Sequence, residues 1–298
     1  MELRFFDDPS EFLDVAGDHL ARQPVLSTVV TTVAERVARE RAAGIPWPEG
    51  VPCWFVAAIE NGEAAGVAMR TATFGANPLF LLPMPDGAAE ELARVVLGRG
   101  EQVSSANGAL PAVELFCDEV AKRTGGAAEV AIHTRLFELG ELVDAGPVEG
   151  DLRAPRRDEE SLVIGWYAAF MADADEQAGR EPGDHGRVDI EPDDLARRIE
   201  GGTYWFWLDD AGERVHLTGA NPPAFGVARI GPVYTPPEQR RKGYAGAAVA
   251  EVSQHFLDAG ARVCLYTDQA NPTSNGIYQA LGYVAVVDQV NLRIVDGS

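Results

Sequence analysis

The chain is 298 residues long, with 46% hydrophobic and 24% charged residues, which is the composition of a globular protein with room for two domains. Its formal net charge of −21 argues against nucleic acid as a partner, because clustered Lys and Arg bind a phosphate backbone. No apolar run approaches the roughly 20 residues that cross a bilayer, so a membrane protein is not expected.

The first half of the chain alternates between strand and helix patterns. In order, the patterns predict a strand at 2–6, helices at 9–20 and 25–43, a hairpin over 53–72, a strand at 78–84, helices at 87–98 and 110–126, and one long strand or a strand pair at 128–139. The hairpin prediction depends on Asn61-Gly62, a pair that is favoured in two-residue turns.

Residues 144–160 combine Pro, Gly and charge without periodicity, which predicts a linker. The same order of elements then returns, with helices at 161–174 and 192–202, a hairpin over 203–220, a strand at 225–235, a helix after 243, a strand at 262–268, a short helix at 273–283 and closing strands at 284–295. Two halves with one order predict an α/β protein of two domains, 1–145 and 146–298. We expect each domain to hold a twisted mixed sheet flanked by helices.

Residues 173–194 form an acidic stretch, with nine Asp or Glu against Arg180 and Arg187. One interpretation is a solvated loop, because charge without apolar periodicity does not form a core. The other is a flap that attracts a positively charged substrate.

Three cysteines, Cys53, Cys117 and Cys264, are widely spaced and form no CxxC pair. They favour neither a disulfide framework nor a metal site, and they fit a reducing compartment. The acidic start "MELRFFDDPSEF" also predicts no signal peptide. We therefore expect a cytoplasmic protein without a metal.

The strand at 225–235 is interrupted by Gly231-Pro232. Because proline cannot donate to a strand ladder, we predict a bend there. Such a bend would leave main-chain groups of Val233 and Tyr234 able to bind something other than a neighbouring strand.

Two arginines and a lysine follow, at residues 240–242, and then Gly243 at the start of a helix. A helix amino terminus has unpaired N–H groups and a positive dipole end, which suit an anion. Gly243, Gly246 and the small Ala245 would let the backbone approach a pyrophosphate closely. The chain has no GxxxxGK[ST] and no GxGxxG after a first strand, which excludes a P-loop and disfavours a dinucleotide fold.

Residues 240–245 read R-x-x-G-x-A, which resembles the acyl-CoA pyrophosphate loop, [QR]-x-x-G-x-[GA], of the GNAT superfamily of N-acetyltransferases. Further along, "NPTSNGIYQALGY" resembles that superfamily's N-x-x-A-x-x-x-Y-x-x-x-G-[FY] segment, although Ser274 replaces the alanine. The matching residues are Asn271, Tyr278, Gly282 and Tyr283. Together the two motifs resemble tandem GNAT proteins with a degenerate first domain.

The first half departs from this pattern. After "PLFLLPM" it reads "PDGAAEELA", which has acids and no glycine loop, and the helix at 110–126 has Phe116 and Cys117 but no tyrosine. The resemblance therefore implies that 1–145 is a GNAT-like domain without acyl-CoA binding, serving as a packing partner or as a wall of the acceptor site.

For 146–298 the resemblance implies acetyl transfer from acetyl-CoA to a small primary amine by direct attack. Tyr278 would protonate the departing sulfur, and Asn271 would bind the pantetheine or order a water. The alternatives are a hydrogen-bonded core tyrosine and a helix cap. The residues that the resemblance assigns to the acyl-CoA site are Val233, Tyr234, Arg240, Arg241, Lys242, Gly243, Tyr244, Ala245 and Asn271.

The general base is left open, because "FGVARIGPVY" lacks the glutamate that many GNAT enzymes place there. Asp268, at the carboxyl end of the strand at 262–268, is one candidate, since acceptors bind at that edge of open sheets. His216 is another. For each, a structural hydrogen bond is the alternative, and a water chain or an amine of low pKa would also suffice.

Two other functions are compatible with the motifs. One is a non-catalytic acyl-CoA-binding sensor, and the other is a cofactor-making enzyme similar to mycothiol synthases. The partners expected are a small-molecule amine and, as one option, a second copy in a homodimer, with neither nucleic acid nor membrane.

Overall fold

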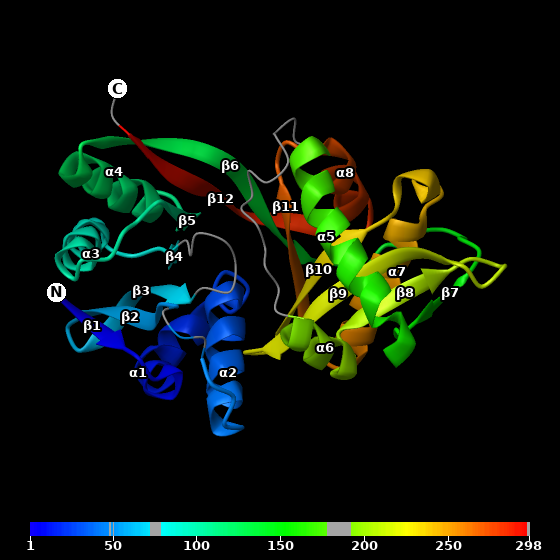
Figure 1. Cartoon of the computed structure of the whole chain (residues 1–298), viewed down its shortest axis with the longest axis horizontal. Helices are drawn as coiled ribbons and strands as arrows, with labels where there is room; N and C mark the ends of the chain where they lie inside the picture. Colours follow the sequence, from blue (N-terminus) through cyan, green and yellow to red (C-terminus); the bar gives the residue numbers. More distant parts are fainter. Residues whose placement is uncertain (48, 50, 72–78, 178–191, 297–298) are drawn as a thin grey trace. The chain divides into compact units, whose positions relative to one another are not determined.

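The structure is a computed structural model that describes residues 1–298 apart from 48, 50, 72–78, 178–191 and 297–298. By contact, the chain divides into two compact units. Unit 1 holds Met1–Thr134 and Val287–Ser298, and unit 2 holds Arg135–Val286. The predicted α/β class with mixed sheets is confirmed (Figure 1). The predicted domains, 1–145 and 146–298, differ from these units in the place of residues 135–145 and 287–298, and as domains they stay a prediction.

Unit 1 is built from seven strands and four helices of the described residues. Their bounds are β1 Glu2–Phe6, α1 Pro9–Arg22, α2 Thr28–Ala42, β2 Cys53–Glu60, β3 Glu63–Thr71, β4 Leu79–Leu81, α3 Asp86–Gly98, β5 Ser105–Ala109, α4 Ala112–Thr124 and β6 Gly126–Leu139, with the seventh strand supplied by the end of β12, Tyr283–Asp296. The strand order is β1-β2-β3-β4-β5-β12-β6. The pair β4–β5 is parallel, whereas β3–β4 and β5–β12 are antiparallel.

Unit 2 repeats this plan. Its elements are β7 Asp151–Arg153, α5 Glu160–Gln177, α6 Pro192–Glu200, β8 Tyr204–Leu208, β9 Arg214–Ala224, β10 Val227–Tyr234, α7 Tyr244–Asp258, β11 Arg262–Asp268 and α8 Pro272–Ala280, with short 3₁₀ turns at Arg157–Glu159 and Pro237–Gln239. The order is β12-β6-β11-β10-β9-β8-β7, and β10–β11 is the parallel pair. The repeated order of elements predicted from the sequence is therefore found.

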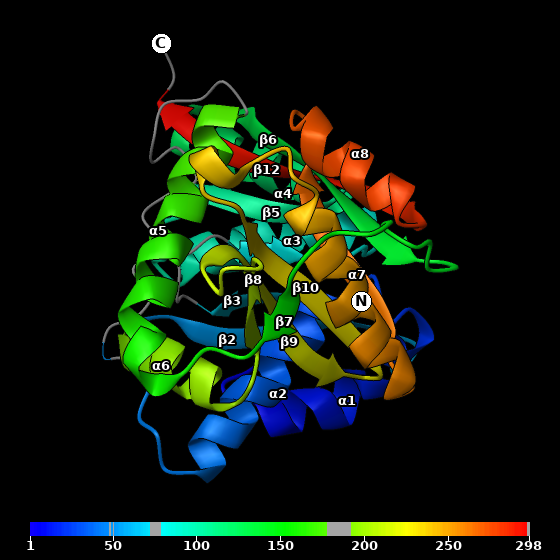
Figure 2. The same cartoon turned by 90° about the vertical axis from the view of Figure 1, so that its right-hand side faces the viewer.

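Each sheet is covered by helices on both faces, as alternation along a central strand predicts. In unit 2, Tyr204 and Phe206 of β8 pack with α5 and α6, whereas Trp205 and Trp207 pack with α7 on the opposite face (Figure 2). In unit 1, Phe55 stacks on Phe12 of α1, while its neighbours on β2 join the cluster under α3 and α4.

Two strands were missed by the sequence prediction. β5 has the sequence "SANGA", whose Asn-Gly reads as a turn. It is held by pairing with β4 and β12, and a Cβ at Gly108 would lie 2.2 Å from the Leu81 carbonyl oxygen, so glycine is needed there for close packing. β7 is three residues long and lies inside the predicted linker, where no alternation can be seen.

A buried carboxylate ties the start of unit 2 together. Glu159 accepts hydrogen bonds from Arg153 at 2.7 Å, Arg214 at 2.7 Å and the main-chain N–H of Arg156 at 2.7 Å. The hydrogen bond from Arg153 is the main cause that lowers the pKa of Glu159 to about 2. The three contacts therefore join β7, β9 and the turn that precedes α5.

We expect Glu159→Gln to lower the free energy of unfolding at neutral pH by about 2–3 kcal/mol, because it removes a charge that the folded state prefers. The folded pKa lies below the unfolded value of about 4.3, so this stability is present above that pH and is lost as pH falls toward 2. Urea unfolding at several pH values measures this effect. As pH falls toward 2, the free energy of unfolding should decrease less steeply for the variant than for the wild-type protein. The control Glu200→Gln, at an exposed position, should leave the pH dependence of the free energy of unfolding unchanged. If Glu159→Gln lost stability with acid as steeply as the wild type, the lowered pKa of Glu159 would not be its source.

None of the helices within the described residues is long and apolar enough to cross a membrane.

Candidate active site

The strand β10 leaves its parallel neighbour before it ends. Its pairing with β11 covers Val227 to Ile230, whose partner is Leu265. Its pairing with β9 continues to Val233 and Tyr234, with a register shift between Ile230 and Val233. The predicted irregularity at Gly231-Pro232 is therefore confirmed. Val233 and Tyr234 lie beyond the residues that pair with β11, so the pairing does not occupy the β11-facing edge of β10 there.

The loop after β10 ends in a glycine that caps α7. Gly243 is the N-cap residue with φ 88°, a left-handed conformation that glycine adopts without strain, and no side chain caps the helix. A Cβ at this position would also lie 3.0 Å from Cγ2 of Val148. The N–H groups of the first turn, from Tyr244 onward, thus keep their capacity to bind an anion at the positive end of the helix dipole.

The three basic side chains of the loop do different things. Arg240 is partly buried, and it donates to the Thr235 carbonyl oxygen at 3.0 Å and to the carboxylate of Asp173 on α5. Lys242 is exposed and donates to Gln239 Oε1 at 2.7 Å. Arg241 is exposed, with no hydrogen bond or ion pair to any described residue. Arg240 therefore anchors the loop, whereas Arg241 is exposed and contacts no described partner.

His216 lies beneath the same loop and is fully buried. Its Nδ1 is 2.7 Å from the Thr235 hydroxyl and its Nε2 is 2.7 Å from the Thr218 hydroxyl. Burial lowers the pKa of His216 to about 3, so the ring is neutral at physiological pH. Both ring nitrogens contact hydroxyl groups, so His216 fits the alternative of a structural hydrogen bond, which here supports Thr235.

Tyr278 of α8 lies in the apolar cluster under α7, where its ring centroid is 6.0 Å from that of Tyr283. Its side chain is 7% exposed, and burial raises its pKa well above the ordinary value for tyrosine. Its hydroxyl makes no hydrogen bond to a described residue, in contrast to Tyr283, which contacts the Ser253 hydroxyl at 2.7 Å. Tyr278 therefore keeps its proton and has a free donor.

The other two predicted residues of this region hold a turn. The side chain of Asn271 accepts from the Ser274 N–H at 3.0 Å and so caps α8, which is the helix-cap alternative. Asp268 ends β11, and its carboxylate accepts from the Ala270 N–H at 2.8 Å. Further roles for Asn271 toward the pantetheine and for Asp268 as a base stay predictions.

Asn275 was missed by the sequence analysis. It accepts from the Thr267 hydroxyl at 2.6 Å and donates to the main-chain oxygens of Asn271 at 2.7 Å and Asp268 at 3.0 Å. These contacts fix the start of α8 on the end of β11, one turn before Tyr278. An asparagine in a helix carries no local signal for such a role, because two of its partners lie on β11.

Unit 1 lacks this arrangement within its described residues. Its β4 stays paired with β5 to the last residue, Leu81 opposite Gly108, and α3 begins behind Pro85 without a glycine cap. The counterpart of Tyr278's helix, α4, buries Phe116 and Cys117, and burial raises the pKa of that thiol to about 12.

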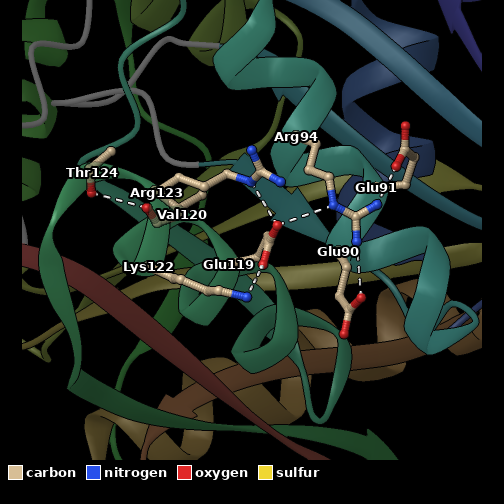
Figure 3. Close-up of polar contacts among 8 residues, drawn as sticks. All are labelled: Glu90, Glu91, Arg94, Glu119, Val120, Lys122, Arg123 and Thr124. Carbon is tan, nitrogen blue, oxygen red and sulfur yellow. Dashed lines mark hydrogen bonds and ion pairs between the residues drawn. The ribbon is translucent and has the colours of Figure 1, made fainter.

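The acidic residues of α3 form a surface network instead (Figure 3). Arg94 pairs with Glu90 and Glu91 of its own helix and with Glu119 of α4 at 3.1 Å. Glu119 also pairs with Arg123 at 2.6 Å. These acids join two helices, and Asp86 adds negative charge in the first turn of α3, where an anion would need positive charge.

No group of three or more His, Cys, Asp or Glu in the described part of the chain is arranged to hold a metal ion. The acidic stretch at 173–194 falls mostly on residues 178–191, which lie outside the described residues.

Comparison with known proteins agrees with this plan. Residues 224–293, which include β10, the loop, α7, β11 and α8, match the model of the FR47-like protein family. A Drosophila protein of known crystal structure is similar over 99% of this chain and 99% of its own, with 15% identity and a TM-score of 0.65. A GCN5-related N-acetyltransferase from Sphaerobacter thermophilus is similar over 92% and 90%, with 18% identity and a TM-score of 0.55. A tandem GNAT protein from the clavulanic acid biosynthesis pathway is similar over 100% and 99%, with 13% identity and a TM-score of 0.52. No curated protein matches the chain.

Proposed function

We propose that this chain, which has the tandem GNAT fold, is an acyl-CoA-dependent N-acyltransferase that works through unit 2 and transfers an acetyl group from acetyl-CoA to a small primary amine. The observation that carries the proposal is that unit 2 combines three features. They are the stretch of β10 beyond its pairing with β11, the glycine N-cap of α7, and the protonated hydroxyl of Tyr278 on α8.

The residues present fit a pyrophosphate-bearing thioester. The first-turn N–H groups of α7 would hold the pyrophosphate, because Gly243 at the N-cap leaves them without a side-chain cap. Arg241 adds positive charge from the solvent side. Main-chain groups of Val233 and Tyr234, beyond the last pair with β11, would bind the arm and polarise the thioester carbonyl.

The reaction needs one proton donor and one proton acceptor. As the amine nitrogen bonds to the carbonyl carbon, the carbon–sulfur bond breaks, and Tyr278 gives its proton to the sulfur. Its raised pKa keeps that proton available throughout the physiological range. The amine loses its proton to Asp268 or to a water chain, and a proton from solvent restores the Tyr278 hydroxyl. His216 is the weaker candidate, because both of its nitrogens are engaged and burial lowers its pKa to about 3.

We expect calorimetric titration with acetyl-CoA to give one site per chain. Among the helix N-caps that the structure describes, only that of α7 is a glycine, and Asp86 would repel a phosphate at the corresponding helix of unit 1. Changes at residues 240–245 should abolish the binding. Two equivalent sites, or binding that survives those changes, would contradict the assignment to unit 2.

Release of free thiol from acetyl-CoA in the presence of an amine panel tests the chemistry itself. A sensor would bind acetyl-CoA without amine-dependent thiol release, so binding without release across the panel would favour the sensor. The proposal places the protein in the cytoplasm, where its three free cysteines stay reduced, and it requires neither nucleic acid nor membrane.

A further inference from the structure

An arginine lies in the interior of unit 2 on the sheet face opposite α7. Arg229 of β10 sits between Asn221 of β9 and Cys264 of β11, its Cα partners in the sheet. Its strand neighbours Ala228 and Ile230 belong to the cluster under α7, so alternation directs Arg229 to the face covered by α5 and α6.

A second arginine approaches from that helical layer. Arg198 of α6 donates to Asn221 Oδ1 at 3.5 Å, and its guanidinium lies 5.5 Å from the centroid of the Tyr204 ring. Because Asn221 is the Cα partner of Arg229, Arg198 reaches the strand residue beside Arg229, and its positive charge is among the causes that lower the pKa of Arg229. Tyr167 of α5 packs against the apolar cluster on the same face. Two cations thus face one region of the sheet.

Neither arginine has a carboxylate partner among the described residues, although the chain has 46 acidic residues against 25 basic ones. The buried Arg70 pairs with Glu101 at 2.7 Å, and Arg153 pairs with Glu159 at 2.7 Å. Arg229 has no such pair, and burial lowers its pKa. Because an interior charge is normally compensated, the exception calls for a ligand with the opposite charge.

The position is within reach of the proposed site. Arg229 keeps some exposed surface, and it lies one residue before Ile230, where β10 and β11 part. Four residues of strand, about 13 Å, separate it from Val233, a length that an arginine side chain and a small acceptor span together.

We propose that Arg229, assisted by Arg198, binds a carboxylate of the acceptor, so that the acceptor class is an amino acid or another amine with a carboxylate. This inference rests on the proposed function. A guanidinium binds a carboxylate through two parallel hydrogen bonds, which also fixes the direction in which the amine points.

The test measures binding rather than turnover. With CoA at saturation, calorimetry compares each N-acetylated amino acid of a panel with its own primary amide, which differs only in the charge. We expect at least one acid to bind about tenfold more tightly than its amide, and we expect Arg229→Gln to remove that preference. Arg198→Gln serves as the second variant if Arg229→Gln does not fold. Arg197→Gln, the same charge change on the exposed side of α6, should keep the preference.

Equal binding of every acid and amide, or a preference that persists in Arg229→Gln, would overturn the inference. Failure of the proposed function would give a different result. A binding preference for carboxylates without thiol release from any amine would support the carboxylate site and reject the transferase. Conversely, equal thiol release with amino acids and their amides would leave the transferase standing and reject the carboxylate site.

Discussion

Tyr278→Phe should lower the turnover number by about 10²-fold, a common loss for a general acid, while acetyl-CoA binding stays nearly unchanged. The substitution removes one hydroxyl that bonds to no described residue and leaves the ring packed against Tyr283. Within the described part of the chain, the substitution therefore removes no hydrogen bond. Steady-state thiol release with a good acceptor, together with calorimetric affinity for acetyl-CoA, measures both quantities.

Tyr283→Phe is the matched control. It removes the hydroxyl of the neighbouring ring, which does contact Ser253 at 2.7 Å, so it should cost about 1 kcal/mol of stability and leave turnover intact. The opposite pattern, with Tyr283→Phe slow and Tyr278→Phe unchanged, would mean that Tyr278 is only a core residue.

Local signals in the sequence were enough to predict much of unit 2. β11 begins and ends at the residues expected, and a helix follows Gly243 as expected. The prediction at Gly231-Pro232 also held, because a missing N–H acts on the strand whatever its neighbours are. The recurrence of element order predicted two α/β domains of one plan, and the motifs at 240–245 and 271–283 resembled those of tandem GNAT proteins. The likeness to a tandem GNAT protein confirms that fold.

Local signals in the sequence could not predict which distant strands pair with each other. β6 gives residues 135–139 to unit 2, and β12 gives residues 287–296 to unit 1, although the composition changes only at 144–160. Periodicity reports which face of a strand is apolar, but it cannot report which strand lies next to it.

The same limit applies to the polar residues of the site. His216 was a candidate base by residue type, and only its two hydroxyl neighbours identify it as a brace. Nothing in the sequence indicated a role for Arg229, because an arginine in a strand has no local signal for a ligand. Its interest arises from what surrounds it, a second arginine and no described acid, and that requires β10, α5 and α6 in place.

Gly243→Val should weaken acetyl-CoA binding by at least about tenfold. A β-branched residue at φ 88° is strained by about 1–3 kcal/mol, and its Cβ would meet Val148 at 3.0 Å, so the start of α7 must shift or the φ angle must change. Either response moves the first-turn N–H groups away from the pyrophosphate. A titration by calorimetry or thermal shift measures the loss.

Gly260→Val separates this effect from simple strain. Gly260 follows the other end of α7 with φ 78°, and a Cβ there would meet nothing within 4 Å, so the backbone strain is comparable and the proposed site is untouched. The two variants should therefore lose similar stability, while Gly260→Val alone keeps the wild-type affinity. If Gly243→Val bound acetyl-CoA as tightly as Gly260→Val, the start of α7 could not be the pyrophosphate site, and the basic loop before it would be only a solvated surface.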